Sequence, residues 1–263
     1  MVRISIVTIV KDHAEGLNWT CRNVLDQTFT DWELILIVGS SEDTTLITAK
    51  EFQAKDSRIH LHEQKGTGIY GAMNEGIQLA GGEFIWFMNA GDRFAAPLIL
   101  EHAIEELSRN NVGVLIGGYR IDDGNSNQGY RIDDGNSNKG YSYANGEVKA
   151  LNFAFNRRGG CHQGMVFRTQ VLKEMGGFNT QYSLAADFDL VLRVIKKAKA
   201  MRTSEIYASI EPGGRADQGI FLVHEQKHEI RGKLLGGSLV LAGSFFWTWL
   251  ARIKITIRNA LKK

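Results

Sequence analysis

The sequence predicts an α/β fold with a mostly parallel sheet and helices on both faces. Three observations support this class. Apolar segments of strand length alternate with segments of helical periodicity over the first hundred residues. The 263-residue chain is 43% hydrophobic and 23% charged, as is typical of a globular protein with a sizeable core. The apolar segment 84–88 stops abruptly at a polar turn, and open α/β sheets bind ligands beyond such strand ends.

The expected elements follow one another along the chain in alternating order. They are strands at residues 3–10, 32–38, 58–62 and 84–88, and helices at residues 15–26, 42–54 and 71–80. Pro97 fits the first turn of a further helix that runs to Ser108, because its missing N–H is not needed there. Such alternation predicts parallel strands joined by right-handed crossovers.

Cysteine usage and the first residues bear on the compartment. Cys21 and Cys161 lie far apart without metal-ligand spacing, which predicts free thiols in a reducing compartment. Residues 1–10 lack the charged start, long apolar stretch and cleavage site of a signal peptide, and are instead typical of a buried strand. We therefore expect a cytoplasmic protein.

The carboxyl-terminal residues form a segment of distinct character. Residues 234–251 carry no charge, and the last twelve residues hold five basic side chains and no acid, so the rest of the chain has a net charge of −3. Two tryptophans beside basic residues favour a helix that lies on an anionic membrane surface. A terminal helix packed on the protein's own core is the alternative. We expect a domain at 1–233, a helical tail at 234–263 and no nucleic-acid partner.

The middle of the chain contains a tandem duplication. Residues 118–128 and 129–139 are identical except at the last position. Two copies do not make a solenoid, and each pairs a short strand with an Asp-Gly turn signal. The duplication therefore predicts a lengthened hairpin or a loop at the rim of the sheet. It is either a neutral insertion or a lid over an active site.

Several segments in order carry a family resemblance. They are residues 5–10, 24–29, 68–76 and 82–92, followed by 161–163, 176–178 and 186–193. Together they resemble family 2 glycosyltransferases of the GT-A fold, a Rossmann-like architecture. The resemblance covers roughly residues 3–215 and leaves out the tail and the duplication.

The resemblance implies transfer of a sugar from a nucleoside diphosphate sugar to an acceptor hydroxyl, with inversion at the anomeric carbon. Asp92 matches the last carboxylate of the family's Asp-x-Asp-type motif and would ligate Mg²⁺ or Mn²⁺. Asp187 matches the family's general base. His162 and Gln163 match a segment near the acceptor or the phosphates. The donor-binding residues implied by the match are Thr8, Val10, Asp12, Asp43, Asn74, Asn89, Ala90 and Gly91.

The acceptor implied by the resemblance is a growing glycan on a lipid carrier, as in bacterial surface-polysaccharide assembly. With the basic tail, this predicts a peripheral protein on the inner face of the cell membrane.

The sequence departs from the family pattern at the donor pocket. Gly39 stands where the family's second strand ends in an Asp that binds the base, and Gly66 and Gly71 stand where near relatives carry acids. A catalytically silent nucleotide-sugar-binding relative is therefore one alternative. Another comes from His224-Glu225-Gln-Lys-His228, which fits the His-Glu-x-x-His pattern of zinc hydrolases. His224 is also a candidate contact for the metal or the diphosphate in a transferase.

Overall fold

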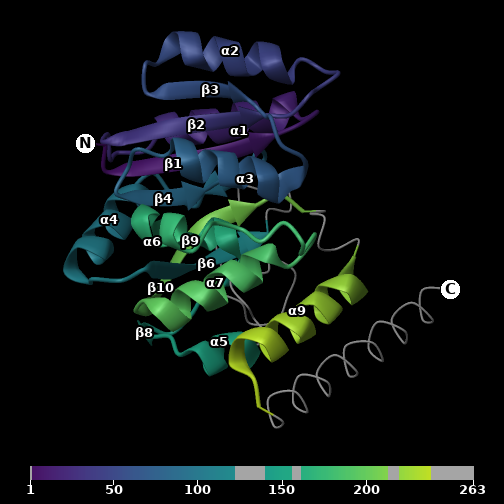
Figure 1. The fold of residues 1–263 in the computed structure, drawn as a ribbon. Helices are drawn as coiled ribbons and strands as arrows, with labels where there is room; N and C mark the ends of the chain where they lie inside the picture. The colour runs from purple at the N-terminus through teal and green to yellow at the C-terminus, as the bar shows by residue number, and fades with distance from the viewer. Residues whose placement is uncertain (1, 122–139, 156–160, 213–218, 238–263) are drawn as a thin grey trace, which may run out of the picture.

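The computed structural model describes residues 2–121, 140–155, 161–212 and 219–237 and shows a central sheet between two layers of helices (Figure 1). The strands are β1 (Ile4–Val10), β2 (Trp32–Val38), β3 (Ile59–Glu63), β4 (Phe84–Phe87), β5 (Arg93–Phe94), β6 (Val114–Ile121), β7 (Gly140–Tyr141), β8 (Gly146–Glu147), β9 (Met165–Arg168) and β10 (Ala200–Ile210). The helices are α1 (Ala14–Leu25), α2 (Thr45–Lys55), α3 (Gly68–Leu79), α4 (Ile99–Arg109), α5 (Ala150–Phe155), the 3₁₀ turn η1 (His162–Gly164), α6 (Thr169–Glu174), α7 (Ala186–Lys197) and α9 (Ile220–Leu235).

The sheet is parallel in its amino-terminal half and mixed beyond it. Its order is β3-β2-β1-β4-β9-β6-β10-β5, with β7 added to β6 and β8 added to β10. The first four strands in this order are parallel, as predicted. Strand β9 enters antiparallel between β4 and β6, which was not predicted. An antiparallel strand begins where its neighbours end, so residues just before β9 lie at the carboxyl edge of the parallel strands.

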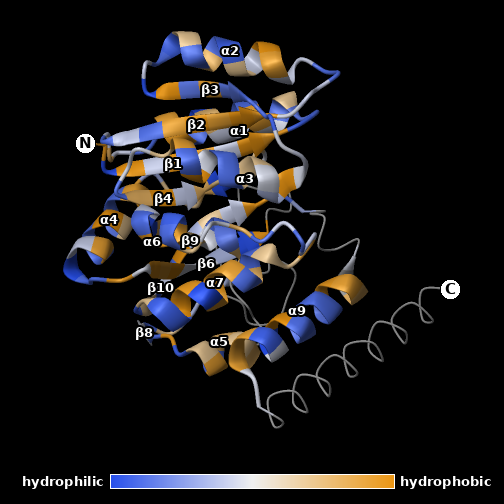
Figure 2. Ribbon diagram, in the orientation of Figure 1, coloured by the Kyte–Doolittle hydropathy of each residue, from blue (hydrophilic) through white to orange (hydrophobic). Residues whose placement is uncertain are grey.

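Two hydrophobic clusters cover the two faces of the sheet. In β1, Ile4 and Ile6 point to the cluster beneath α1, α2 and α4, whereas Val7 and Ile9 point to the cluster beneath α3, α5, α6 and α7. This follows from the period of two along a strand. Figure 2 shows the apolar residues concentrated on the strands between the helix layers. A Cβ at Gly76 would lie 2.4 Å from a methyl group of Val7, so this glycine lets α3 approach β1 closely.

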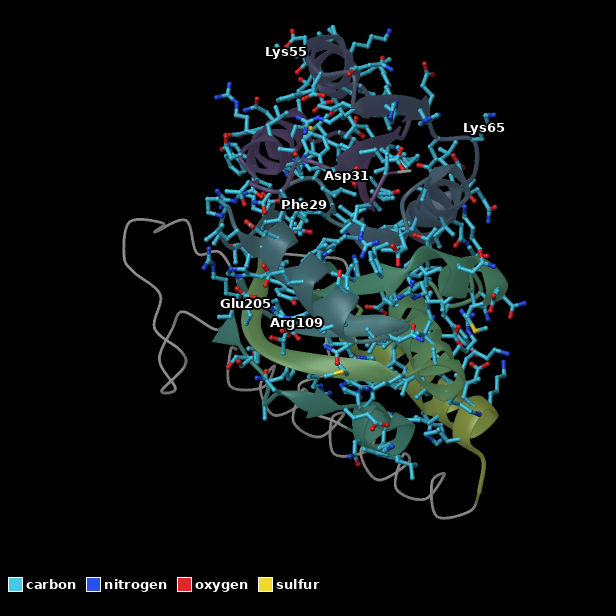
Figure 3. All side chains as sticks on the ribbon, turned by 90° about the vertical axis from the view of Figure 1, so that its left-hand side faces the viewer. Phe29, Asp31, Lys55, Lys65, Arg109 and Glu205 are labelled. Atoms are coloured by element: carbon cyan, nitrogen blue, oxygen red, sulfur yellow. The ribbon has the colours of Figure 1, made fainter. Side chains whose placement is uncertain are left out.

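The helix starts differ from prediction at α2, α3 and α4, and α3 begins at Gly68 rather than at residue 71. Helix α2 begins at Thr45, since the Asp43 carboxylate accepts a hydrogen bond from the Thr45 N–H (2.9 Å) and residues 42–44 form a turn. Pro97 stands before α4 rather than in its first turn, and its carbonyl accepts the Thr28 N–H (3.0 Å). Figure 3 views the molecule from the side of α4, with Arg109 at the end of that helix and Lys55 at the end of α2.

The duplication and the tail lie largely outside the described residues. Strand β6 runs into the first copy as far as Ile121 and pairs antiparallel with β7, which follows the second copy, with Tyr119 opposite Tyr141. Residues 122–139 fall outside the described ranges. Helix α9 continues to Leu235, so the predicted boundary at residue 233 falls inside it, and residues 238–263 are not described. Within the described ranges, no helix combines the length and apolar content needed to cross a bilayer.

Candidate active site at the carboxyl edge of the sheet

The carboxyl ends of β1, β3 and β4 and the start of α3 enclose a cavity of about 440 Å³, within the size range of small-molecule sites. Its lining consists of Ile9, Val10, Lys11, His13, Gln64, Gly68, Ile69, Ala72, Asn89 and Ala90. Val10, Asn89 and Ala90 are predicted donor-binding residues. Lys11, His13 and Gln64 are polar residues that the sequence analysis missed, although each follows a predicted strand.

Thr8 is not among the residues that line the cavity. Its side chain is buried, and its hydroxyl donates to the carbonyl of Met88 at 2.7 Å. This hydrogen bond joins β1 to the start of the turn that follows β4. Thr8 therefore supports the site through the backbone in this structure.

Asp12 and Asp43 connect the loops that follow β1 and β2. Asp12 has φ of 49°, the only positive value for a non-glycine residue among those described, and its carboxylate accepts the Glu42 N–H at 2.7 Å. Asp43 accepts the N–H groups of Thr45 (2.9 Å) and Ala14 (3.1 Å). The hydrogen bonds from Thr45 lower the pKa of Asp43. Neither carboxylate lines the cavity, so their role in donor binding stays a prediction.

Asn74 of α3 is hydrogen-bonded to the Gly-Gly-Phe turn at residues 176–178, which follows α6. Its amide donates to the carbonyl of Phe178 (2.9 Å) and accepts the Phe178 N–H (2.7 Å). Gly177, at φ of 71°, leaves room for this contact, because a Cβ there would lie 2.3 Å from the Asn74 amide oxygen. Both polar atoms of Asn74 are thus used within the fold.

Asp92 ends the turn after β4 and is held from two sides. Gly91 makes the turn at φ of 94°, and Asp92 is only 4% exposed. One carboxylate oxygen accepts the side-chain amide of Gln163 (2.8 Å), and the other accepts the N–H of Glu211 (3.0 Å). Burial raises the pKa of Asp92 to about 6. A neighbouring cation would therefore stabilise its ionised form.

Glu211 was not predicted as a site residue. It follows β10 directly, and its carboxylate pairs with His13 at 2.9 Å above the turn. A Cβ at Gly91 would lie 2.1 Å from a carboxylate oxygen of Glu211, so the glycine admits this pair. The signal in the sequence is weaker than for Asp92, because β10 mixes polar and apolar residues and only its end, residues 206–210, is mostly apolar before this carboxylate.

His162 connects the turn after β4 to Asp187. Its Nε2 lies 3.3 Å from the side-chain nitrogen of Asn89, and its Nδ1 lies 3.8 Å from a carboxylate oxygen of Asp187. With Nε2 accepting from the amide, Nδ1 carries the proton and faces Asp187. The Asn89 side-chain oxygen is buried and has no hydrogen-bond partner among the residues that the structure describes. It is therefore available to a ligand or to bound water.

Asp187 and Asp189 have different surroundings, as the helical spacing predicts. Asp187 is half-buried in the first turn of α7. Burial opposes its ionisation, but the hydrogen bond and charge of His162 and the charge of Lys227 outweigh it and hold the pKa of Asp187 below its usual value. Asp189 is buried and pairs with Arg193 at 2.8 Å. Asp187 is thus the carboxylate that faces the site.

Comparisons with known proteins identify the family. The model of "Glycosyl transferase family 2" matches residues 5–176, which is more than half of the chain. The chain belongs to glycosyl transferase family 2. The predicted enzyme class, glycosyltransferase, is confirmed.

One relative of this glycosyltransferase is the Escherichia coli UDP-Glc:alpha-D-GlcNAc-diphosphoundecaprenol beta-1,3-glucosyltransferase WfgD. The two are 32% identical over 124 residues, which cover 47% of this chain and 48% of that enzyme. The chain is therefore aligned with about half of WfgD.

Two solved structures show the same fold. Staphylococcus aureus TarS 1–349, in complex with UDP-GlcNAc, has a TM-score of 0.69 at 14% identity, covering 92% of this chain and 71% of that chain. The mannosyltransferase PcManGT from Pyrobaculum calidifontis, in complex with GDP-Man and Mn²⁺, has a TM-score of 0.68 at 14% identity, covering 99% of this chain and 76% of that chain. The predicted GT-A fold is confirmed.

The turn after β4 in this glycosyltransferase fits a divalent cation. The Asp92 carboxylate is buried and its pKa is raised, and the Glu211 carboxylate lies close to the same turn. Within the described ranges, the Asn89 side-chain oxygen has no hydrogen-bond partner. Oxygen ligands of this kind suit Mg²⁺ and Mn²⁺, which take few protein ligands and complete their shell with phosphates and waters.

The His-Glu-x-x-His segment lies on α9, as its spacing predicts for a helix. Burial, with the charges of Lys227 and Arg231, lowers the pKa of His224. Across the described ranges, no three His, Cys, Asp or Glu side chains are grouped closely enough to hold a metal ion. Within them, His224 and His228 thus lack the third protein ligand of a catalytic zinc site.

Proposed function

We propose that this glycosyltransferase moves a sugar from a nucleoside diphosphate sugar to a hydroxyl of a glycan or lipid-linked acceptor, with inversion at the anomeric carbon. The observation that carries the proposal is the connection from Asn89 through His162 to Asp187, which brings a carboxylate next to the turn that ends in Asp92. The turn that ends in Asp92 follows β4, whose carboxyl end also contributes to the cavity.

Asp187 is the general base in this proposal. Its pKa lies below the usual value, so the carboxylate is ionised at neutral pH and can accept the proton of the acceptor hydroxyl. His162 holds the carboxylate from one side, and the first turn of α7 favours its negative charge. Inversion follows if the acceptor oxygen attacks the sugar from the side opposite the leaving diphosphate.

Asp92 would hold Mg²⁺ or Mn²⁺ together with the donor diphosphate. The cation, when bound, neutralises the negative charge that develops on the leaving group. Gln163 and the Glu211 N–H keep the carboxylate oriented toward this role. Asn89 would meet the ribose or a metal-bound water, and His162 lies on the acceptor side.

The acceptor is a lipid-linked glycan in this proposal, and the enzyme works at the inner face of the cell membrane. WfgD is named for a diphosphoundecaprenol acceptor, which supports this class of substrate. Five basic residues among the last twelve would attract the tail to anionic lipids. The donor's sugar and nucleotide depend on pocket shape and a few hydrogen bonds.

Donor binding and sugar transfer can be tested in two successive experiments. A melting-temperature screen with nucleoside diphosphates, with and without Mn²⁺, should identify the nucleotide, because a ligand that binds only the folded state stabilises it. Transfer from the matching sugar nucleotide to a lipid-diphosphate-linked sugar should then give a glycoside of opposite anomeric configuration by NMR. Retained configuration would contradict the proposed mechanism, and binding without transfer would support a silent binding protein.

A further inference from the structure

Helix α9 packs on α7 at the end that carries Asp187, and Figure 1 shows the two helices side by side. Gln226 of α9 is 8% exposed, and its side-chain oxygen accepts the N–H groups of Leu184 and Ala185, each at 3.0 Å. Its amide nitrogen donates to the Ser183 hydroxyl at 3.2 Å. A residue from another helix therefore satisfies the backbone that leads into α7.

The N-cap residue itself offers no cap to this helix. Ala185 occupies the N-cap position and has no side chain that could accept a hydrogen bond, while inside the helix the Asp187 carboxylate accepts the N–H of Phe188 at 2.7 Å. Buried backbone N–H groups require partners, and those of Leu184 and Ala185, just before the helix, are bonded to Gln226. Asp187 follows only two residues later, so the contact made by Gln226 lies directly before the proposed base.

Other residues of α9 contact the first turn of α7. Lys227 places its ammonium group 5.1 Å from the ring centre of Phe188, and Arg231 places its guanidinium 5.3 Å from the same ring. Ile230 is fully buried between them in sequence. One face of α9 therefore packs on the first turn of α7 over more than one helical turn.

The positive charge of Lys227 on α9 also acts on Asp187. The Phe188 N–H donates to this carboxylate at 2.7 Å, His162 from η1 lies 3.8 Å from it, and the charge of Lys227 from α9 acts on it. Lys227 is a cation among them, and its attraction favours the ionised carboxylate. Geometry and charge thus act on the same side chain.

We propose, on the basis of the function proposed above, that Gln226 is a positioning residue for the general base. Through two hydrogen bonds to the backbone of Leu184 and Ala185 it sets how the chain enters α7, and with it the direction of the Asp187 carboxylate toward the acceptor. Gln226 itself touches neither donor nor acceptor in this role. Helix α9 is then part of the catalytic apparatus, although it follows the segment that matches the family model.

The test compares Gln226→Met, Gln226→Asn and Gln226→Glu with wild type. Methionine keeps the length but removes the acceptor, and asparagine is one methylene too short to reach both N–H groups. Both should lower kcat by about 10- to 100-fold, the scale of a small misplacement of a catalytic group. Donor Kd should change by less than about twofold, because binding energy is not altered. Glutamate keeps an acceptor oxygen and should restore kcat to within a few-fold.

Two controls separate the possible failures. Gln53→Met makes the same change at an exposed position of α2 and should leave kcat unaltered. Asp187→Asn reports on the base: full activity in that variant would overturn the base assignment and this inference with it. If Asp187→Asn is inactive but both Gln226→Met and Gln226→Asn keep wild-type kcat, only the positioning role is overturned. Failure of Gln226→Glu to restore kcat would also overturn it. Should Gln226→Met not fold, the asparagine and glutamate variants decide the matter.

Discussion

Gln163 donates its side-chain amide to a carboxylate oxygen of Asp92 at 2.8 Å, and both residues are buried. The contact joins the segment before β9 to the turn after β4, 71 positions apart in the sequence. It orients a carboxylate whose pKa burial raises to about 6. The protonation state of Asp92 should therefore make both the free energy of unfolding and cation binding depend on pH.

Metal-free protein should lose stability as the pH rises toward 6. The pKa of Asp92 is raised in the folded state, so the folded protein holds this proton more tightly than the unfolded chain. The resulting stability is complete below pH 4 and is lost as pH rises through about 6, with a total of about 3 kcal/mol for a shift of about two units.

Urea unfolding of wild type and Asp92→Asn from pH 4 to 7 measures this effect. The variant should lack this decline, because an amide does not titrate in this range. Equal pH dependence in the two proteins would contradict the assignment of the raised pKa to Asp92.

Asp92→Asn should weaken metal-dependent donor binding. The substitution replaces an anionic oxygen ligand by a neutral amide of the same shape, and hard cations prefer the anion. Titration of the sugar nucleotide with and without Mn²⁺ should show a metal effect of at least about tenfold in wild type, a difference of about 1.4 kcal/mol, and little in the variant.

Chelator should act on wild type as the Asp92 substitution does. Asp31→Asn is a matched control for Asp92→Asn and should leave the metal effect unchanged. Asp31 is exposed and lies just before β2, at the amino-terminal edge of the parallel strands and away from the cavity. Full activity in excess chelator would remove the metal role assigned to Asp92.

Removal of residues 238–263 should abolish binding to anionic liposomes and preserve transfer to a soluble acceptor. The cut leaves α9 whole, which matters because Leu234 and Leu235 pack against the core. It removes the five basic residues that would attract anionic lipids. Sedimentation with anionic and zwitterionic vesicles measures the effect. Undiminished sedimentation of the truncated protein with anionic vesicles would refute a membrane-binding tail.

Deletion of residues 129–139 should change the melting temperature by no more than a few degrees. One copy of the duplicated segment would still connect β6 to β7, and shortening a surface connection changes loop entropy only slightly. A large loss of stability would show that the second copy is packed in the fold. A loss of transfer at unchanged stability would support the lid interpretation.

The sequence predicted those parts of the fold and site that depend on local patterns. Strand β2 has the predicted bounds because an apolar stretch is flanked by turn formers. Asp92 and Asn89 were proposed as site residues because the segment 82–92, a strand followed by a polar turn, resembles the family's motif. The pairing of Glu211 with His13 and the effect of Lys227 on Asp187 depend on long-range packing. The residues around Glu211 and Lys227 in the sequence carry no signal for either contact. The antiparallel direction of β9 is equally a property of the assembled sheet.

Paired substitutions at Asp187 and Asp189 test the central claim most directly. Asp187→Asn should retain donor binding and melting temperature but lower the rate of transfer by roughly 10² to 10⁴-fold, the usual contribution of a positioned base. Asp189→Asn should weaken the buried pair with Arg193 and cost about 1.5–3 kcal/mol of stability, with a far smaller effect on the rate. If the two effects are exchanged, the base is Asp189. If neither variant loses transfer, the mechanism proposed for this glycosyltransferase is wrong.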